Sequence, residues 1–248
     1  MDETRNTLAF ILERRPYREV DSLVTVYTQL FGKLNLIARG TKKLKSKLAG
    51  HIEPLTISEI MIVKGRGFDY IGSAINRRSY LNLRANLNKL YYTGRAINLF
   101  NKFIKDSESD ERLFFLLENW LAIIDASSDD FAKEKGELLF SFFALKFLDE
   151  LGYKPEMYKC LLGSEDIAPG KNFFNLINGG LICSSCLEKN KASNSQNNLN
   201  TLTISDNCIK IIRFIIKNDF ISVYKLRVNK KIIKELYKLV SDYLLFCS

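Results

Sequence analysis

The chain of 248 residues contains one histidine and no glycine-rich phosphate-binding motif. Ser-His-Asp and Cys-His catalytic arrangements would all have to use His51, which has no evident partner in the sequence. The nearest approach to a P-loop, Pro169-Gly170-Lys171, lacks the first glycine and the final Ser or Thr. Paired acids such as Asp129-Asp130 stand where a helix start explains them. We therefore expect the protein not to be an enzyme.

Long apolar runs are also missing. The most apolar stretch, residues 138–148, contains Lys146 and is shorter than the roughly 18 residues that a membrane span needs, so it predicts a buried helix. The first residues, M-D-E-T-R-N, include acids where a secretory signal peptide has cations. The five cysteines are an odd number, and three of them, Cys160, Cys183 and Cys186, cluster in one short region, which in a reducing compartment favours metal binding over disulfides. These features predict a cytoplasmic protein.

Acidic residues are absent between Asp21 and Glu53, although this stretch is rich in lysine and the net charge of the chain is +9. A cationic loop without local counter-charges, held on a sheet, is typical of a protein that binds a phosphate backbone. No residue pattern for reading bases is evident, so binding should tolerate any sequence and depend on salt. The predicted DNA-binding residues are Lys33, Arg39, Lys42, Lys43, Lys45, Lys47 and Arg66.

Residues 7–76 contain five short strand-like segments, several of them with alternating apolar residues, separated by turn signals such as Gly65-Arg66-Gly67. Five strands in about 70 residues, with no helix between them, favour a small closed or partly open barrel. Aromatic side chains on such a barrel either stack on unpaired bases or fill its core. The aromatic residues available for stacking are Tyr17, Tyr27, Phe31, Phe68 and Tyr70.

From residue 83 onward the apolar residues recur at helical spacing, which predicts amphipathic helices that pack as a bundle. The third of these helices should end near Gly152, with Pro155 just beyond it. A glycine-containing insert at about 156–200 interrupts the bundle, and its Asn/Ser-rich end, residues 191–200, is too polar to be buried. The prediction is α+β: a barrel domain at 1–80 and a helical domain at 81–248.

The insert contains Cys183-Ser184-Ser185-Cys186, which has the spacing of a zinc knuckle, and Cys160 precedes it by 23 residues. A structural zinc site needs four ligands, usually Cys or His. Gly163 occupies the position that would complete an upstream C-x-x-C motif. Two readings stay open: one structural zinc held by Cys160, Cys183 and Cys186 with a carboxylate such as Glu165 or Asp166, or a metal-free turn held by packing.

Two blocks of the sequence are distinctive. The first runs from R-R-P-Y-R-E-V-D-S-L-V-T-V-Y-T through F-G-K-L-N-L-I-A-R-G-T-K-K-L-K-S-K-L-A-G to E-P-L-T. The second comprises L-D-E-L-G-Y-K-P, a following cysteine, and G-G-L-I-C-S-S-C. The first block closely resembles the opening of the RecO family of bacterial recombination mediators, and the second resembles the cysteine module of that family. The resemblance extends over nearly the whole chain in order.

The resemblance implies an N-terminal OB-fold and a C-terminal helical domain with a zinc-finger-like insert. It also implies binding to single- and double-stranded DNA, annealing of complementary strands, and help in loading RecA onto DNA coated by single-strand-binding protein (SSB). The implied partners are RecR, the C-terminal tail of SSB and, indirectly, RecA, at work on the bacterial nucleoid.

Two alternatives are open. The first is a structural interaction module whose basic patch docks acidic protein tails rather than DNA. The second is a metal-dependent enzyme that uses the cysteine insert, for which the sequence supplies neither an open coordination position nor a nearby base.

Overall fold

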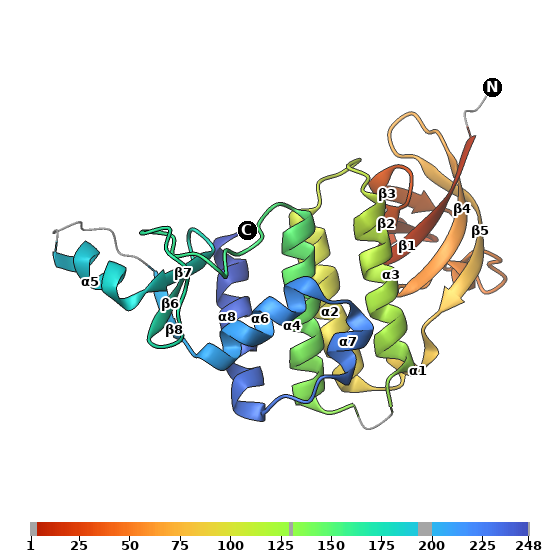
Figure 1. The fold of residues 1–248 in the computed structure, drawn as a ribbon. Coiled ribbons are helices and arrows are strands. Elements are labelled where there is room, and N and C mark those ends of the chain that lie inside the picture. The colour runs from red at the N-terminus through yellow and green to blue at the C-terminus, as the bar shows by residue number, and fades with distance from the viewer. Residues whose placement is uncertain (1–3, 129–130, 193–199, 248) are drawn as a thin grey trace. The chain divides into compact units, whose positions relative to one another are not determined.

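The computed structural model describes residues 4–128, 131–192 and 200–247, which belong to two compact units, Met1–Ala126 and Ser127–Ser248 (Figure 1). The predicted domain boundary near residue 80 lies at the end of the last barrel strand, whereas the two compact units divide at residue 126. The boundary near residue 80 stays a prediction. Most of the Asn/Ser-rich run and the pair Asp129-Asp130 lie outside the described residues.

Within the described part of the first unit, five strands form a closed barrel in the order β1-β2-β3-β5-β4. All neighbours are antiparallel except β3 and β5, which are parallel. This arrangement confirms the predicted OB-type barrel. The strands are β1 (Thr4–Tyr17), β2 (Asp21–Thr28), β3 (Gly32–Ala38), β4 (Thr56–Val63) and β5 (Tyr70–Ser79), with a short 3-10 helix η1 (Ala49–His51) between β3 and β4.

The long strand β1 pairs with both β2 and β4, and a register shift between Ile11 and Glu13 separates its ladder with β2 into two parts. Such a bulge increases the local bend and twist that a small closed sheet needs. The apolar residues of the strands turn inward and fill the barrel. Its core is Ala9, Ile11, Val24, Val26, Leu36, Ala38, Ile52, Ile60, Ile62, Ile71 and Ala74.

The first unit also contains α1 (Leu81–Arg84), α2 (Leu87–Phe103) and α3 (Glu111–Ala126). The Asn86 side chain accepts hydrogen bonds from the backbone N–H groups of residues 88 and 89, which fixes the start of α2. Tyr27 of β2 packs against Phe100 of α2 and Phe114 of α3, with ring centroids 4.7 and 6.4 Å apart. The helices therefore bury the outer face of β2, which explains why that strand lacks a simple alternation of buried and exposed residues.

The second unit is built on α4 (Lys133–Glu150), which is buried along residues 136–145 and confirms the helix predicted from the most apolar stretch. It ends at Glu150, just before Gly152 as predicted; the φ of Gly152 is +85°, which suits a glycine, and Tyr153 N–H donates back to the Leu148 carbonyl. Around α4 lie α6 (Asp206–Lys217), α7 (Phe220–Lys225) and α8 (Lys230–Phe246), each capped by a polar side chain at its start.

The insert forms a small antiparallel sheet in the order β7-β6-β8, comprising β6 (Asn172–Asn175), β7 (Gly180–Cys183) and β8 (Thr201–Ile204), and the helix α5 (Ser184–Ala192). The sequence did not predict this sheet, because strands of four residues are too short to show a period. In the described part of the chain, no helix combines the length and apolar composition that a membrane crossing requires.

Gly32, in the turn between β2 and β3, generates a stability prediction. Its φ is +69°, and a Cβ there would lie 2.3 Å from the backbone carbonyl of Glu108, in the connection between α2 and α3. Because backbone cannot move aside as a side chain tip can, Gly32→Ala should lower the free energy of unfolding by at least about 2 kcal/mol.

Gly67→Ala is the matched control, because nothing lies within 4 Å of its ideal Cβ position and its φ is not positive. Urea denaturation of the two variants measures the difference. Equal stabilities would contradict the close packing of the α2–α3 connection on this turn.

Candidate nucleic-acid interface and cysteine cluster

The loop between β3 and η1 presents a dense group of positive charges. Its side chains at Arg39, Lys42, Lys43, Lys45 and Lys47 are exposed, and the stretch from residue 39 to residue 47 contains no acid. We call these five residues the basic loop. For Lys43, Lys45 and Lys47, the described residues supply no hydrogen bond or ion pair, so their ammonium groups face solvent. Lys42 Nζ donates to the Arg18 carbonyl at 2.9 Å.

The backbone of the basic loop is anchored to the barrel. Gly40 N–H donates to Asp21 Oδ1 at 2.8 Å, and Lys42 N–H donates to the Val20 carbonyl at 3.0 Å. The buried hydroxyl of Thr41 lies 2.7 Å from Ser22 Oγ. These bonds hold the loop against the start of β2 while its charged side chains point outward.

Arg14 of β1 adds a bridge across the whole loop. Its guanidinium donates to the carbonyls of Thr41 and Ala49, both at 3.2 Å, and to Ser22 Oγ at 3.2 Å. It also pairs with Glu53 at 2.7 Å, so the acid that follows the loop is neutralised by a residue outside it. Sequence reasoning missed this role, because Arg14 stands beside Arg15 in a strand with nothing to distinguish it.

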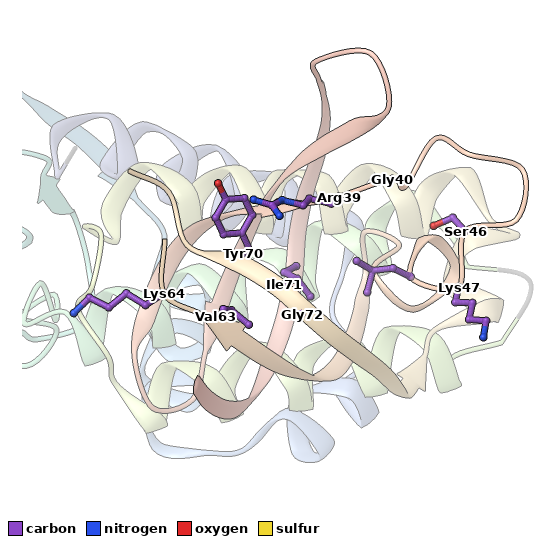
Figure 2. A pocket seen from close by; sticks show the side chains of 10 residues that line it. Arg39, Gly40, Ser46, Lys47, Val63, Lys64, Tyr70, Ile71 and Gly72 are labelled. Atoms are coloured by element: carbon purple, nitrogen blue, oxygen red, sulfur yellow. The ribbon is translucent and has the colours of Figure 1, made fainter. Parts of the chain in front are cut away.

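A groove of ≈570 Å³ opens beside the basic loop, where the barrel wall is least continuous (Figure 2). Strands β3 and β5 pair only through Ile37 and Tyr70, with Ile37 N–H donating to the Asp69 carbonyl at 2.9 Å. The basic loop and the β4–β5 hairpin border this seam. The groove is lined by Arg39, Gly40, Ser46, Lys47, Leu48, Val63, Lys64, Tyr70, Ile71 and Gly72.

Figure 2 shows Arg39 beside the ring of Tyr70, with Ser46 and Lys47 farther along the groove. The Arg39 guanidinium carbon lies 3.9 Å from the Tyr70 ring centroid, a close cation–π contact. Nearby, Phe68 is 45% exposed and makes an edge contact with Tyr17 at 6.3 Å between centroids. The groove thus combines cations, an aromatic face and the apolar side chains of Leu48, Val63 and Ile71.

Two of the predicted DNA-binding residues lie apart from the basic loop. Arg66 is exposed at the tip of the β4–β5 hairpin. The Lys33 side chain is only 13% exposed; its ammonium donates to the Asn101 carbonyl at 3.2 Å and to the Ile104 carbonyl, and lies 3.5 Å from Asp106. The amino group of Lys33 is thus already engaged at the end of α2.

The aromatic candidates also divide. Tyr27 is fully buried and exchanges hydrogen bonds with the backbone of Asp110, and burial raises the pKa of its hydroxyl. Of the two roles left open for the aromatic residues, Tyr27 therefore has the packing role, because α2 and α3 cover its face of β2. Phe31 is half-buried, with the Arg5 guanidinium 4.8 Å from its ring centroid.

In the second unit, the structure brings the three predicted metal ligands together. The sulfur atoms of Cys160, Cys183 and Cys186 all lie within 4.8 Å of one another. Cys183 ends β7, Cys186 lies in the first turn of α5, and buried Cys160 begins a tight turn that Leu161 N–H ties to the Leu181 carbonyl. Neither suggested carboxylate, Glu165 or Asp166, belongs to this described cluster.

The donor set fits three of the four positions of a zinc site. With zinc–sulfur bonds of about 2.3 Å, tetrahedral ligands stand about 3.8 Å apart, which small side-chain rotations of these cysteines would reach. The pKa of the Cys183 thiol is lowered, chiefly by its hydrogen bond with Ser185, while that of Cys186 is raised, chiefly by its hydrogen bond with Cys183. The cluster could therefore bind a thiophilic metal ion.

An OB-type barrel with a basic loop beside a groove that contains an aromatic side chain is an arrangement used by the class of single-strand nucleic-acid-binding proteins. The family model "Recombination protein O N terminal" matches residues 1–80, and "Recombination protein O C terminal" matches residues 84–246. The chain belongs to the RecO family of DNA repair and recombination proteins.

Curated relatives agree with this assignment. The chain is 28% identical to a DNA repair protein RecO from Dehalococcoides mccartyi over 230 residues, which is 93% of the chain and 85% of the relative. It is 27% identical to the one from Alkaliphilus metalliredigens over 241 residues, 96% of the chain and 92% of the relative. A Thermoanaerobacter relative is 25% identical over 239 residues, 96% and 90% of the two chains.

The bridge made by Arg14 yields a second prediction. Arg14→Met removes the hydrogen bonds to Thr41, Ala49 and Ser22 and leaves Glu53 unpaired, so the free energy of unfolding should fall by about 1–3 kcal/mol. Amide hydrogen exchange in residues 40–49 should accelerate more than exchange elsewhere in the barrel.

Arg15→Met is the control, because Arg15 is exposed and only pairs with Glu13 at 3.4 Å. Unchanged exchange in the loop of the Arg14 variant would show that the other anchors suffice.

Proposed function

We propose that the chain is a recombination mediator that binds DNA through the basic loop and its groove and acts without catalysis. The observation that carries this proposal is the pairing of five exposed cations, on a loop anchored by Arg14, with a groove that Tyr70 helps to line. Preformed loops lose little conformational entropy on binding, so their charges contribute more to affinity than those of a flexible tail.

In this proposal the phosphates of a single strand contact Arg39, Lys42, Lys43, Lys45 and Lys47, with Arg66 at the hairpin tip as a further contact. One or more bases enter the groove and stack on Tyr70, where the Arg39 guanidinium also lies. Lys33 serves instead to hold the β2–β3 turn to the end of α2, because its ammonium is occupied there. Double-stranded DNA would use the phosphate contacts without base stacking.

Annealing of complementary strands follows from the same surface. Two single strands repel each other through their phosphates, and a cationic surface that lowers this repulsion lets the bases meet and pair. The step needs no bond to be made or broken by the protein. This is consistent with a non-enzymatic role in the bacterial cytoplasm, on DNA under repair.

The partners of this role, RecR, RecA and the acidic C-terminal tail of SSB, are proposed from family membership alone. An acidic protein tail could also occupy the basic loop. Competition between an acidic peptide and single-stranded DNA distinguishes a shared site from separate ones: full displacement indicates one surface, and simultaneous binding indicates two.

We also propose that Cys160, Cys183 and Cys186 hold one structural zinc ion. The three thiols come from a turn, a strand and a helix of the insert, so a shared ion would crosslink these elements. Its role would be folding of the insert and not chemistry on a substrate.

The first functional prediction concerns the exposed lysines. Replacing Lys43, Lys45 and Lys47 by alanine should weaken binding to single-stranded oligonucleotides of every sequence alike. The slope of log affinity against log salt should become shallower by about 2, because each lost phosphate contact removes about 0.7. Fluorescence anisotropy over a salt series measures both effects.

The control removes the same charge from the second unit, by replacing the exposed residues Lys225, Lys234 and Lys238 by alanine. Net charge is then equal in the two variants. If both lose the same slope, affinity reflects overall charge and the basic loop has no special role.

The groove generates a separate prediction for Tyr70. Tyr70→Ala should reduce affinity for single-stranded DNA by about 1–3 kcal/mol while leaving the salt slope unchanged, because stacking releases no counterions. Affinity for duplex DNA should change little, and Tyr70→Phe, which keeps the ring, should bind single strands normally. An equal loss for single and double strands would indicate that Tyr70 supports the fold of the loop instead of stacking on a base.

A further inference from the structure

The cysteine cluster is built from two turns with the same spacing. One is Cys160-Leu161-Leu162-Gly163 and the other is Cys183-Ser184-Ser185-Cys186. The first turn is closed by hydrogen bonds from Ser164 N–H to the Cys160 carbonyl and from Cys160 N–H to the Glu165 carbonyl, both 2.8 Å. Cys183 N–H approaches Cys160 Sγ at 3.5 Å, which joins the turns. Three of the four positions i and i+3 thus carry a thiol, and the fourth is Gly163.

Gly163 lies next to the cysteine cluster. An ideal Cβ on Gly163 would lie 2.8 Å from Cys186 Sγ. The backbone itself does not require glycine here, because φ of Gly163 lies outside the positive range that disfavours side chains. What the glycine lacks is therefore a side chain that would project toward Cys186 Sγ, from the position where a fourth thiol would stand.

After Cys186, the side chain nearest to the ideal Cβ position of Gly163 is that of Glu165. Its carboxyl carbon lies 3.9 Å from the ideal Cβ of Gly163, yet its carboxylate does not join the described group whose ligand atoms all lie within 4.8 Å of one another. Among the residues that the structure describes, the cluster thus offers three sulfur donors and no fourth His, Cys, Asp or Glu donor in place. Four-coordinate zinc with three protein ligands takes its fourth ligand from solvent or from a small molecule.

We propose that this chain binds a divalent thiophilic ion through Cys160, Cys183 and Cys186 alone, and that the fourth coordination position, on the Gly163 side, is open to a small exogenous donor. The class of ligand is a neutral nitrogen donor, a thiol or water. The inference rests on the proposed zinc binding and adds to it that the site is accessible and exchangeable, unlike a closed four-cysteine site.

The test uses the full chain loaded with Co²⁺, whose absorption reports both thiolate ligation and coordination geometry. We expect one Co²⁺ per chain with a thiolate charge-transfer band, and we expect added imidazole to shift the visible d–d bands. Cys247→Ser is the control, because Cys247 lies outside the cluster, and it should leave stoichiometry and spectrum unchanged.

Two variants at Gly163 examine the open position. Gly163→Cys should raise the charge-transfer intensity by about a third, in proportion to a fourth thiolate, and abolish the response to imidazole. The Cys186 sulfur can rotate away from the new Cβ, and far-ultraviolet circular dichroism checks the fold. Gly163→Ala supplies the same Cβ without the thiol and should gain no charge-transfer intensity.

Several outcomes would overturn the proposal, and they are distinguishable. Absence of stoichiometric Co²⁺ would refute the zinc site itself. Stoichiometric Co²⁺ with no response to imidazole would refute only the open position. A change in the spectrum of Glu165→Gln before any ligand is added would show that Glu165 already occupies the fourth position. The imidazole and Glu165→Gln measurements decide the matter even if Gly163→Cys does not fold.

Discussion

The structure of the candidate DNA site depends on how the barrel closes. Among the described residues, β3 and β5 meet only at Ile37 and Tyr70, while every other pair of neighbouring strands forms a long ladder. This short parallel pairing closes the barrel, and beyond it the residues on the two sides of the β3–β5 seam are not joined by a strand ladder. The groove occupies that seam, and Tyr70, which makes the closing contact, also lines it. The closure of the barrel and the shape of the candidate binding groove therefore both depend on the position of Tyr70.

The charged loop next to the seam would contribute little if it moved freely. Its anchors lie in β1 and β2: the Arg14 guanidinium, the Asp21 carboxylate and the buried pair of hydroxyls on Ser22 and Thr41. Arg14 and Asp21 carry charges of opposite sign next to the loop. The Arg14 guanidinium bonds to loop carbonyls and to Glu53, and the Asp21 carboxylate accepts a hydrogen bond from Gly40 N–H. The exposed lysines of the basic loop are therefore not neutralised by these anchors, and their positive charge is available to a ligand.

The sequence predicted the parts of this arrangement that leave a linear pattern. Alternating apolar residues indicated the barrel strands, and the missing acids between Asp21 and Glu53 indicated the basic loop. The sequence could not show that the ammonium of Lys33 is bound within the protein while that of Lys43 faces solvent, because the carbonyls that accept from Lys33 belong to residues about 70 positions later. It could not decide between stacking and packing for Tyr27 for the same reason, since the helices that cover Tyr27 follow far along the chain. Arg14 and the groove depend wholly on such distant contacts. In the insert, the cysteine spacing correctly indicated a cluster, whereas the four-residue strands of the insert are too short to be predicted from the sequence.

The central claim is that single-stranded DNA lies along the basic loop and enters the groove. Photocross-linking of the full chain to a bromodeoxyuridine oligonucleotide, followed by mass spectrometry of the peptides, tests it most directly. The account predicts adducts on Tyr70 and on the peptide that spans residues 39–48. Efficient cross-linking confined to residues outside the barrel, with both of those peptides unmodified, would contradict it.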